Sequence, residues 1–119
     1  MTTPLLEVLR RARLRLTVPG QWTKGALARD ASARIVPDRS PAATCWCAAG
    51  AVFTEASALL SDNEANALAV SAIAKLRAAV PGGPCLDLSA FNDAQETVVP
   101  VLDVFDAVIA RLESAPAAP

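Results

Sequence analysis

The chain has 119 residues and a net charge of −1, with 53% hydrophobic and 19% charged residues. This length fits one domain with a core of its own, and the composition is too apolar for an intrinsically disordered protein. The longest apolar run covers the nine residues from Cys45 to Phe53, well short of the roughly 20 that a membrane-spanning helix needs. We therefore expect a single globular domain at residues 1–113, with no membrane span, and a disordered tail at residues 114–119.

Two residue types are missing from the chain. It contains no histidine and no tyrosine, which removes the commonest general base and the commonest zinc ligand. This shortage argues against an enzyme. The N-terminus lacks the apolar core of a signal peptide, so we expect a cytoplasmic protein whose three cysteines are thiols rather than a disulfide framework.

Charge is unevenly distributed along the chain. Residues 1–39 hold eight basic and three acidic side chains, whereas residues 40–119 hold three basic and nine acidic ones. The two parts therefore carry +5 and −6. Faces of opposite sign would steer partners or dock against each other within a homo-oligomer.

The first predicted elements are a helix and a hairpin. Thr3 and Pro4 suit the N-cap and first position of a helix, and apolar residues then recur at helical spacing. We predict a helix from Pro4 to Arg15, with four arginines on solvated faces. The stretch WTKGALARDASARIVPD predicts a short hairpin with strands at 26–30 and 33–36.

A central helix is predicted next. Ser40 and Pro41 repeat the cap signal, and the helix extends from Pro41 to about Leu60. Trp46, Gly50 and Phe53 fall on one side of this helix and form its core face, with Gly50 allowing another element to approach closely.

The segment CWCAAGA at residues 45–51 has three interpretations. A packed core is favoured because free cysteine prefers burial, and because Cys45 and Cys47 of one helix would lie on opposite flanks. A metal site would need both of them with Cys85 and a carboxylate such as Asp87, and it lacks paired CxxC spacing. A redox or nucleophilic Cys47 would need a depressed pKa, and no cation is adjacent in sequence to cause one.

Two further helices complete the predicted fold. A capping box at Ser61–Glu64 starts a helix over 62–79, which PGGP at 81–84 ends. The segment 85–97 is expected to be a loop with one short extended or helical piece. The last helix begins near Thr97 and has the strongest apolar face. The prediction is a mainly α domain of about four helices, with a small β-hairpin between the first and central helices.

Two polar pairs stand out as more than solvated surface. Arg29 and Asp30 lie at the hairpin turn, and Asn92 and Asp93 follow an aromatic residue in the long loop. As turn and cap residues they need no other role. Alternatively, both pairs converge beside Trp22 and the end of the central helix, where they form a small polar site on an apolar floor.

Three stretches carry a resemblance: WTKGALARD at 22–30, CWCAAGA at 45–51 and FND at 91–93. Their order is similar to that in a family of small bacterial and phage proteins of unknown function, with W-x-x-G-A-x-A-R-D, W-C-x-x-G-A and aromatic-N-D motifs. The match covers roughly residues 5–112 and implies no activity. It points to Trp22, Gly25, Ala26, Arg29, Asp30, Trp46, Cys47, Gly50, Ala51, Asn92 and Asp93. The chain departs from the pattern at Ala33, where a turn glycine is usual, and at Val98, where a histidine often follows the threonine.

These observations lead to one functional expectation and two alternatives. We expect a small soluble binding or interaction module, for a protein partner or a second copy of the chain, with no metal ion and no cofactor. The first alternative is a small-molecule or nucleotide-binding protein, including a hydrolase, whose candidate ligand-binding residues are Trp22, Arg29, Asp30, Cys47, Asn92 and Asp93. The second is a phage-type nucleic-acid-associated regulator that uses the Arg10–Arg15 face. The acidic remainder of the chain argues against a specific nucleic-acid site.

Overall fold

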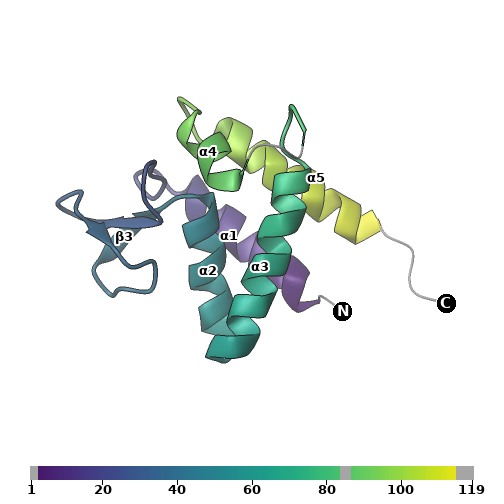
Figure 1. Ribbon diagram of the computed structural model, residues 1–119, viewed down its shortest axis with the longest axis horizontal. Helices are drawn as coiled ribbons and strands as arrows, with labels where there is room; N and C mark the ends of the chain where they lie inside the picture. The colour runs from purple at the N-terminus through teal and green to yellow at the C-terminus, as the bar shows by residue number, and fades with distance from the viewer. Residues whose placement is uncertain (1–2, 84–86, 115–119) are drawn as a thin grey trace.

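The computed structural model describes residues 3–83 and 87–114. These residues form five helices and one three-stranded sheet, in the order α1 (Pro4–Thr17), β1 (Ala28–Asp30), β2 (Ile35–Val36), β3 (Ala43–Trp46), α2 (Ala48–Leu59), α3 (Asp62–Ala78), α4 (Leu88–Asp93) and α5 (Val99–Ser114). The helices gather into one body, and the sheet extends from one side of it (Figure 1). The prediction of a mainly α single domain is confirmed, with α4 as a helix beyond the four expected.

Helix α1 forms where the sequence predicts it. The Thr3 hydroxyl accepts a hydrogen bond from the backbone N–H of Leu6 at 3.2 Å, and Pro4 occupies the first turn. The buried stripe includes Val8, Leu9 and Leu16. The helix continues two residues beyond the predicted end, to Thr17.

The predicted hairpin is confirmed and is part of a larger sheet. β1 pairs antiparallel with β2 on one edge and with β3 on the other, so the strand order is β2-β1-β3. In the turn between β1 and β2, one carboxylate oxygen of Asp30 accepts hydrogen bonds from the N–H groups of Ser32 and Arg34, both at 2.9 Å. Ala33 adopts a left-handed backbone, φ 65°. Glycine adopts this conformation at little cost, which explains why the family motif usually has glycine at this position.

The prediction of a helix from Pro41 to Leu60 is wrong in its first third. The Ser40 hydroxyl accepts from the N–H of Ala42 at 3.1 Å within a turn, and the chain then forms β3. The segment Ala43–Trp46 suits a strand because it contains threonine and tryptophan. Cys47 is the N-cap of α2. Trp46, Cys45 and Cys47 are therefore not neighbours on one helix.

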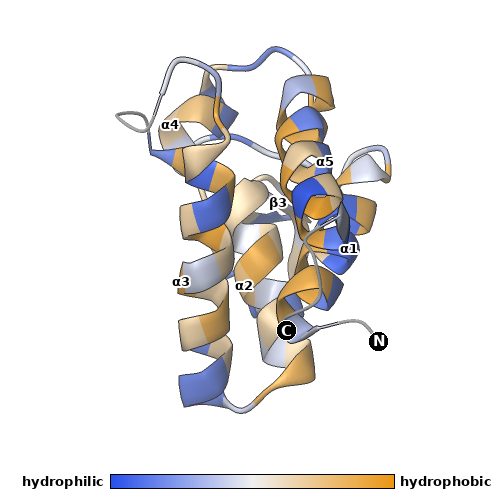
Figure 2. Cartoon of the chain, turned by 90° about the vertical axis from the view of Figure 1, so that its right-hand side faces the viewer, coloured by the Kyte–Doolittle hydropathy of each residue, from blue (hydrophilic) through white to orange (hydrophobic). Residues whose placement is uncertain are grey.

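Helix α2 is the central element, and it packs against α1 and α3. Figure 2 shows it beside α3, coloured largely in orange tones. Its N-terminal turn lies directly on the segment before β1, because a Cβ at Gly50 would be 2.0 Å from the carbonyl oxygen of Leu27. Gly50 and Trp46 are buried, and Phe53 is partly buried against the core.

Helices α3, α4 and α5 close the core. α3 begins one residue after Ser61, but the Ser61 side chain makes no capping hydrogen bond, so the predicted capping box is absent. The short α4 is capped by Asp87, whose carboxylate accepts from the N–H of Ala90 at 2.7 Å. Phe105 of α5 is fully buried, and α5 includes Ser114, so the disordered tail predicted from residue 114 does not begin there.

Two expectations fall outside the described residues: the disordered tail at 115–119 and any role of Cys85. Among the helices of residues 3–83 and 87–114, none is both long enough and apolar enough to cross a membrane.

Candidate functional site

Asn92 is the centre of the polar cluster that the sequence indicated. It lies at the end of α4 and is fully buried. Its side-chain oxygen accepts from Trp22 Nε1 at 2.8 Å and from the N–H of Ala48 at 3.1 Å. Its amide nitrogen donates to the carbonyl oxygen of Thr23 at 3.1 Å. One side chain therefore ties α4 to the 22–25 loop and to the first turn of α2.

Asp93 and Arg29 bind opposite ends of one peptide group. Asp93 Oδ1 accepts from the N–H of Gly25 at 2.9 Å, and the Arg29 guanidinium donates to the carbonyl oxygen of Lys24 at 3.1 Å. The N–H and the carbonyl belong to the same peptide bond, which is held between the sheet and α4. Both motif residues thus fix the loop that carries Trp22.

Asp30 does not join this cluster. Its carboxylate accepts from the hairpin turn, as described above, and forms an ion pair with Arg34 at 3.5 Å. The predicted convergence therefore holds for three residues of the two pairs, Arg29, Asn92 and Asp93, and fails for Asp30. The reason is local: an aspartate at the end of a strand caps its own turn at short range.

Cys47 is buried at the start of α2, 2% exposed. Its sulfur accepts from the N–H of Gly50 at 3.4 Å. Burial raises the pKa of the thiol above its ordinary value, and the backbone N–H groups of Gly50 and Ala49 offset this only in part. A redox or nucleophilic role would need the opposite shift.

A small pocket of about 180 Å³ lies beside this cysteine, lined by Gly25, Ala26, Leu27, Cys47, Ser89 and Asp93. It is smaller than the roughly 300 Å³ at which ligand pockets begin. Within residues 3–83 and 87–114, no group of three or more cysteine, aspartate or glutamate side chains is placed to hold a metal ion. The Cys45 sulfur instead contacts the carbonyl oxygen of Arg29, at 3.8 Å.

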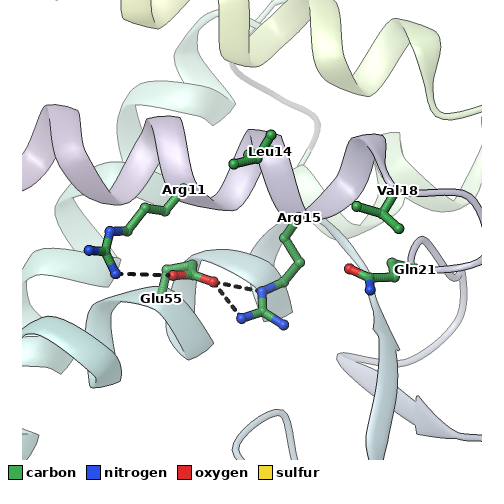
Figure 3. Close-up of a pocket in the computed structure, with 6 residues that line it drawn as sticks. All are labelled: Arg11, Leu14, Arg15, Val18, Gln21 and Glu55. Atoms are coloured by element: carbon green, nitrogen blue, oxygen red, sulfur yellow. Dashed lines mark hydrogen bonds and ion pairs between the residues drawn. The ribbon is translucent and has the colours of Figure 1, made fainter.

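A second, larger pocket of about 440 Å³ lies where the C-terminal half of α1 and the residues that follow it meet α2, and we call it the α1 groove. Figure 3 shows its six lining residues: Arg11, Leu14, Arg15, Val18, Gln21 and Glu55. Sequence reasoning missed this groove. The one signal for it was Leu14, an apolar residue outside the buried stripe of α1.

Glu55 and Arg15 form the fixed part of the α1 groove. Glu55 is only 7% exposed and lies between Arg11 and Arg15 (Figure 3). Its carboxylate binds Arg15 through Nε at 2.7 Å and Nη2 at 2.6 Å. The Arg15 guanidinium also lies over the Trp46 ring, 4.3 Å from its centroid. Arg15 is thus held on two sides.

The arginines of α1 are engaged within the chain. Arg10 pairs with Glu113 and Arg13 with Asp106, which ties α1 to α5. Arg11 binds Glu7 at 3.0 Å, in addition to its long contact with Glu55. The basic N-terminal part therefore meets the acidic remainder of the same chain, so the Arg10–Arg15 face offers less net charge to a phosphate backbone than the sequence suggests.

These features define a small helical module with an attached three-stranded sheet, a buried polar joint at Asn92 and an open groove on α1. The chain belongs to the family of unknown function DUF6197, whose model matches residues 1–111. No curated protein and no solved structure matches the chain.

Proposed function

We propose that the protein is a small binding module that docks a protein partner, or a second copy of itself, through the α1 groove. The observation that carries this proposal is the exposure of two apolar side chains one helical turn apart beside a concave surface. Leu14 is 67% exposed and Val18 is 43% exposed, and both line the groove. Clustered apolar residues at a groove with a polar rim are typical of interaction sites.

The polar side of the groove suits binding because it is already ordered. Glu55 and the Trp46 ring fix Arg15 before any partner arrives, so little side-chain entropy is lost on association. Gln21 lies at the rim, and among the described residues its side-chain amide has no hydrogen-bond partner. Of the described residues, a partner would therefore contact an apolar strip, an immobilised guanidinium and an amide that has no hydrogen-bond partner.

The arrangement gives less support to the alternatives. The hydrogen-bonding atoms of Arg29, Asn92 and Asp93 named above are used to hold the 22–25 loop, and the pocket beside them is small. Their hydrogen bonds within the chain are sufficient to fix the Trp22 loop, so this arrangement requires no ligand. The pairing of the α1 arginines reduces the case for a nucleic-acid regulator.

Site-specific photocrosslinking tests the proposal. Leu14 is replaced by a benzophenone amino acid in the cells that normally make the protein. The matched control carries the same group at Val70, which is similarly exposed, 61%, but lies on α3 outside the groove. We expect one discrete adduct from position 14 and none from position 70. An adduct of twice the chain mass would identify self-association.

A second substitution connects any adduct to the groove. Val18→Glu should abolish the adduct from position 14 because it places a charge on the apolar strip. Val99→Glu, at a residue 57% exposed on α5, should leave the adduct intact. Equal adducts from positions 14 and 70, or no adduct from position 14, would contradict the proposal.

A further inference from the structure

A second groove lies between α3 and α5 and shares no lining residue with the α1 groove. It has a volume of about 200 Å³ and is lined by Lys75, Ala78, Val108, Arg111 and Leu112. Val108 is 3% exposed and Leu112 is partly buried, so an apolar floor lies between two exposed cations. One cation comes from α3 and the other from α5. We call this the α3–α5 groove.

Among the residues that the structure describes, the two cations of the α3–α5 groove have no carboxylate partner, unlike the α1 arginines. Within residues 3–83 and 87–114, neither Lys75 nor Arg111 forms an ion pair. The sequence explains this, because the positions three and four residues away on each helix hold only alanine, serine or valine. The acidic groups Asp106 and Glu113 of α5 pair with α1 instead.

We propose that the α3–α5 groove binds an acidic amphipathic helix of a protein partner, with an apolar side chain over Val108 and Leu112 and carboxylates beside Lys75 and Arg111. Charge complementarity carries the assignment, because the described lining of the groove holds two cations and no anion. The volume is below that of a typical small-molecule pocket and suits the insertion of one or two side chains. A groove between two helices commonly receives such side chains from a third.

The position of the cations also sets the pattern of the partner. Lys75 and Arg111 come from opposite walls of the groove. A helix with leucines at i, i+3 or i+4 and i+7, and with glutamates on both flanks of that stripe, would place carboxylates toward both walls. A basic amphipathic helix would meet like charge at both positions.

The experiment uses the full chain and two synthetic probe peptides. The acidic probe carries the leucine stripe flanked by glutamates, and the matched probe has lysine at every glutamate position. Binding is followed by fluorescence anisotropy of the labelled peptide and by backbone amide chemical shifts of the protein at low salt. We expect the acidic probe to bind, the lysine probe not to bind, and the largest shifts to fall on α3 and α5.

Charge reversal then tests the named cations. The double variant Lys75→Glu/Arg111→Glu should weaken binding of the acidic probe by about tenfold or more and should gain binding of the lysine probe. Arg34→Glu is the control, since it changes the charge at an exposed residue of the hairpin turn outside the groove, and it should have little effect. Circular dichroism and an unchanged urea midpoint confirm that the variants are folded.

Three results would overturn the inference: no binding of the acidic probe, equal binding of the two probes, or full binding retained by the double variant. Amide shifts confined to the α1 groove would overturn it as well, because they would move the acidic ligand to the other site. The photocrosslinking at Leu14 does not involve this surface, so either proposal can fail while the other stands.

Discussion

Two physical arguments predict opposite effects of Gly50→Ala on the free energy of unfolding. Helix propensity alone favours alanine over glycine within a helix by up to about 1 kcal/mol. In the structure, however, the added Cβ would lie 2.0 Å from the Leu27 carbonyl oxygen and 2.8 Å from its carbonyl carbon. Both are backbone atoms, so no side-chain rotation relieves the contact, and α2 must move away from the segment before β1.

The cost of that movement has two parts, overpacking and the weakening of a hydrogen bond. Overpacking of a rigid site costs about 1–3 kcal/mol or more. The shift also weakens the hydrogen bond from the N–H of Cys47 to the Leu27 oxygen, 3.1 Å long, at a further cost of about 0.5–1.5 kcal/mol. We therefore expect Gly50→Ala to lower the free energy of unfolding by about 2–4 kcal/mol, a large part of a typical total of 5–15 kcal/mol.

Urea denaturation followed by tryptophan fluorescence measures this change. Ala58→Gly is the matched control, because Ala58 is exposed on the same helix and reports propensity without packing; it should cost about 1 kcal/mol or less. A Gly50→Ala protein as stable as the parent chain, or more stable, would refute the close approach of α2 to Leu27.

Three further predictions concern single residues. Asn92→Ala should cost about 3–5 kcal/mol in urea denaturation, because it removes a fully buried side chain and leaves one buried and two partly buried hydrogen-bonding groups without this partner. A loss below about 1 kcal/mol would contradict its central role. Ala33→Gly should raise the free energy of unfolding by about 0.5–1 kcal/mol by relieving a left-handed backbone, and a loss of stability would count against that backbone. Burial holds the pKa of the Cys47 thiol above its unfolded value. The free energy of unfolding is therefore unaffected by this thiol below about pH 8.5. It falls by up to about 1.4 kcal/mol per pH unit as the pH rises from there toward the folded pKa, because only the unfolded chain then loses the proton. Cys47→Ala should remove this component of the alkaline loss, and rapid labelling of native Cys47 by iodoacetamide at pH 8 would contradict its burial.

Short-range signals in the sequence predicted the helices well. The start of α1 follows from its capping residues Thr3 and Pro4, and the position of α3 follows from apolar residues at helical spacing. These features act within one or two turns of chain, and a single sequence displays them directly. The hairpin at residues 28–36 could be predicted for the same reason.

The error at Pro41 shows where such reasoning stops. Ser40–Pro41 has the composition of a helix start, yet the next residues pair with β1, through Ala28 with Trp46 and Arg29 with Cys45. Pairing with a strand many residues earlier is a long-range interaction that outweighs local propensity. The alanines that suggested a helix begin it only after Cys47.

The candidate site was only partly predicted, because its geometry also depends on contacts between distant parts of the chain. Asn92 and Asp93 were recognised as unusual, and they do meet the Trp22 loop and, through one peptide group, Arg29. Which atoms meet depends on how α4 docks against α2, and no local pattern encodes that docking. The α1 groove was missed because Glu55 and Arg15 are 40 residues apart and each is unremarkable alone.

The polar groups of this chain fall into two sets with different consequences for function. The side chains of the motif residues Arg29, Asn92 and Asp93 form hydrogen bonds with the loop that carries Trp22. These polar groups therefore stabilise the fold. Binding requires groups that the fold leaves open. On the described surface these include Gln21 beside an exposed Leu14, and Lys75 with Arg111 beside a buried Val108. Substitutions in the first set should therefore act mainly through stability, whereas substitutions in the second should leave the fold intact and, on the binding proposed for the two grooves, weaken that binding.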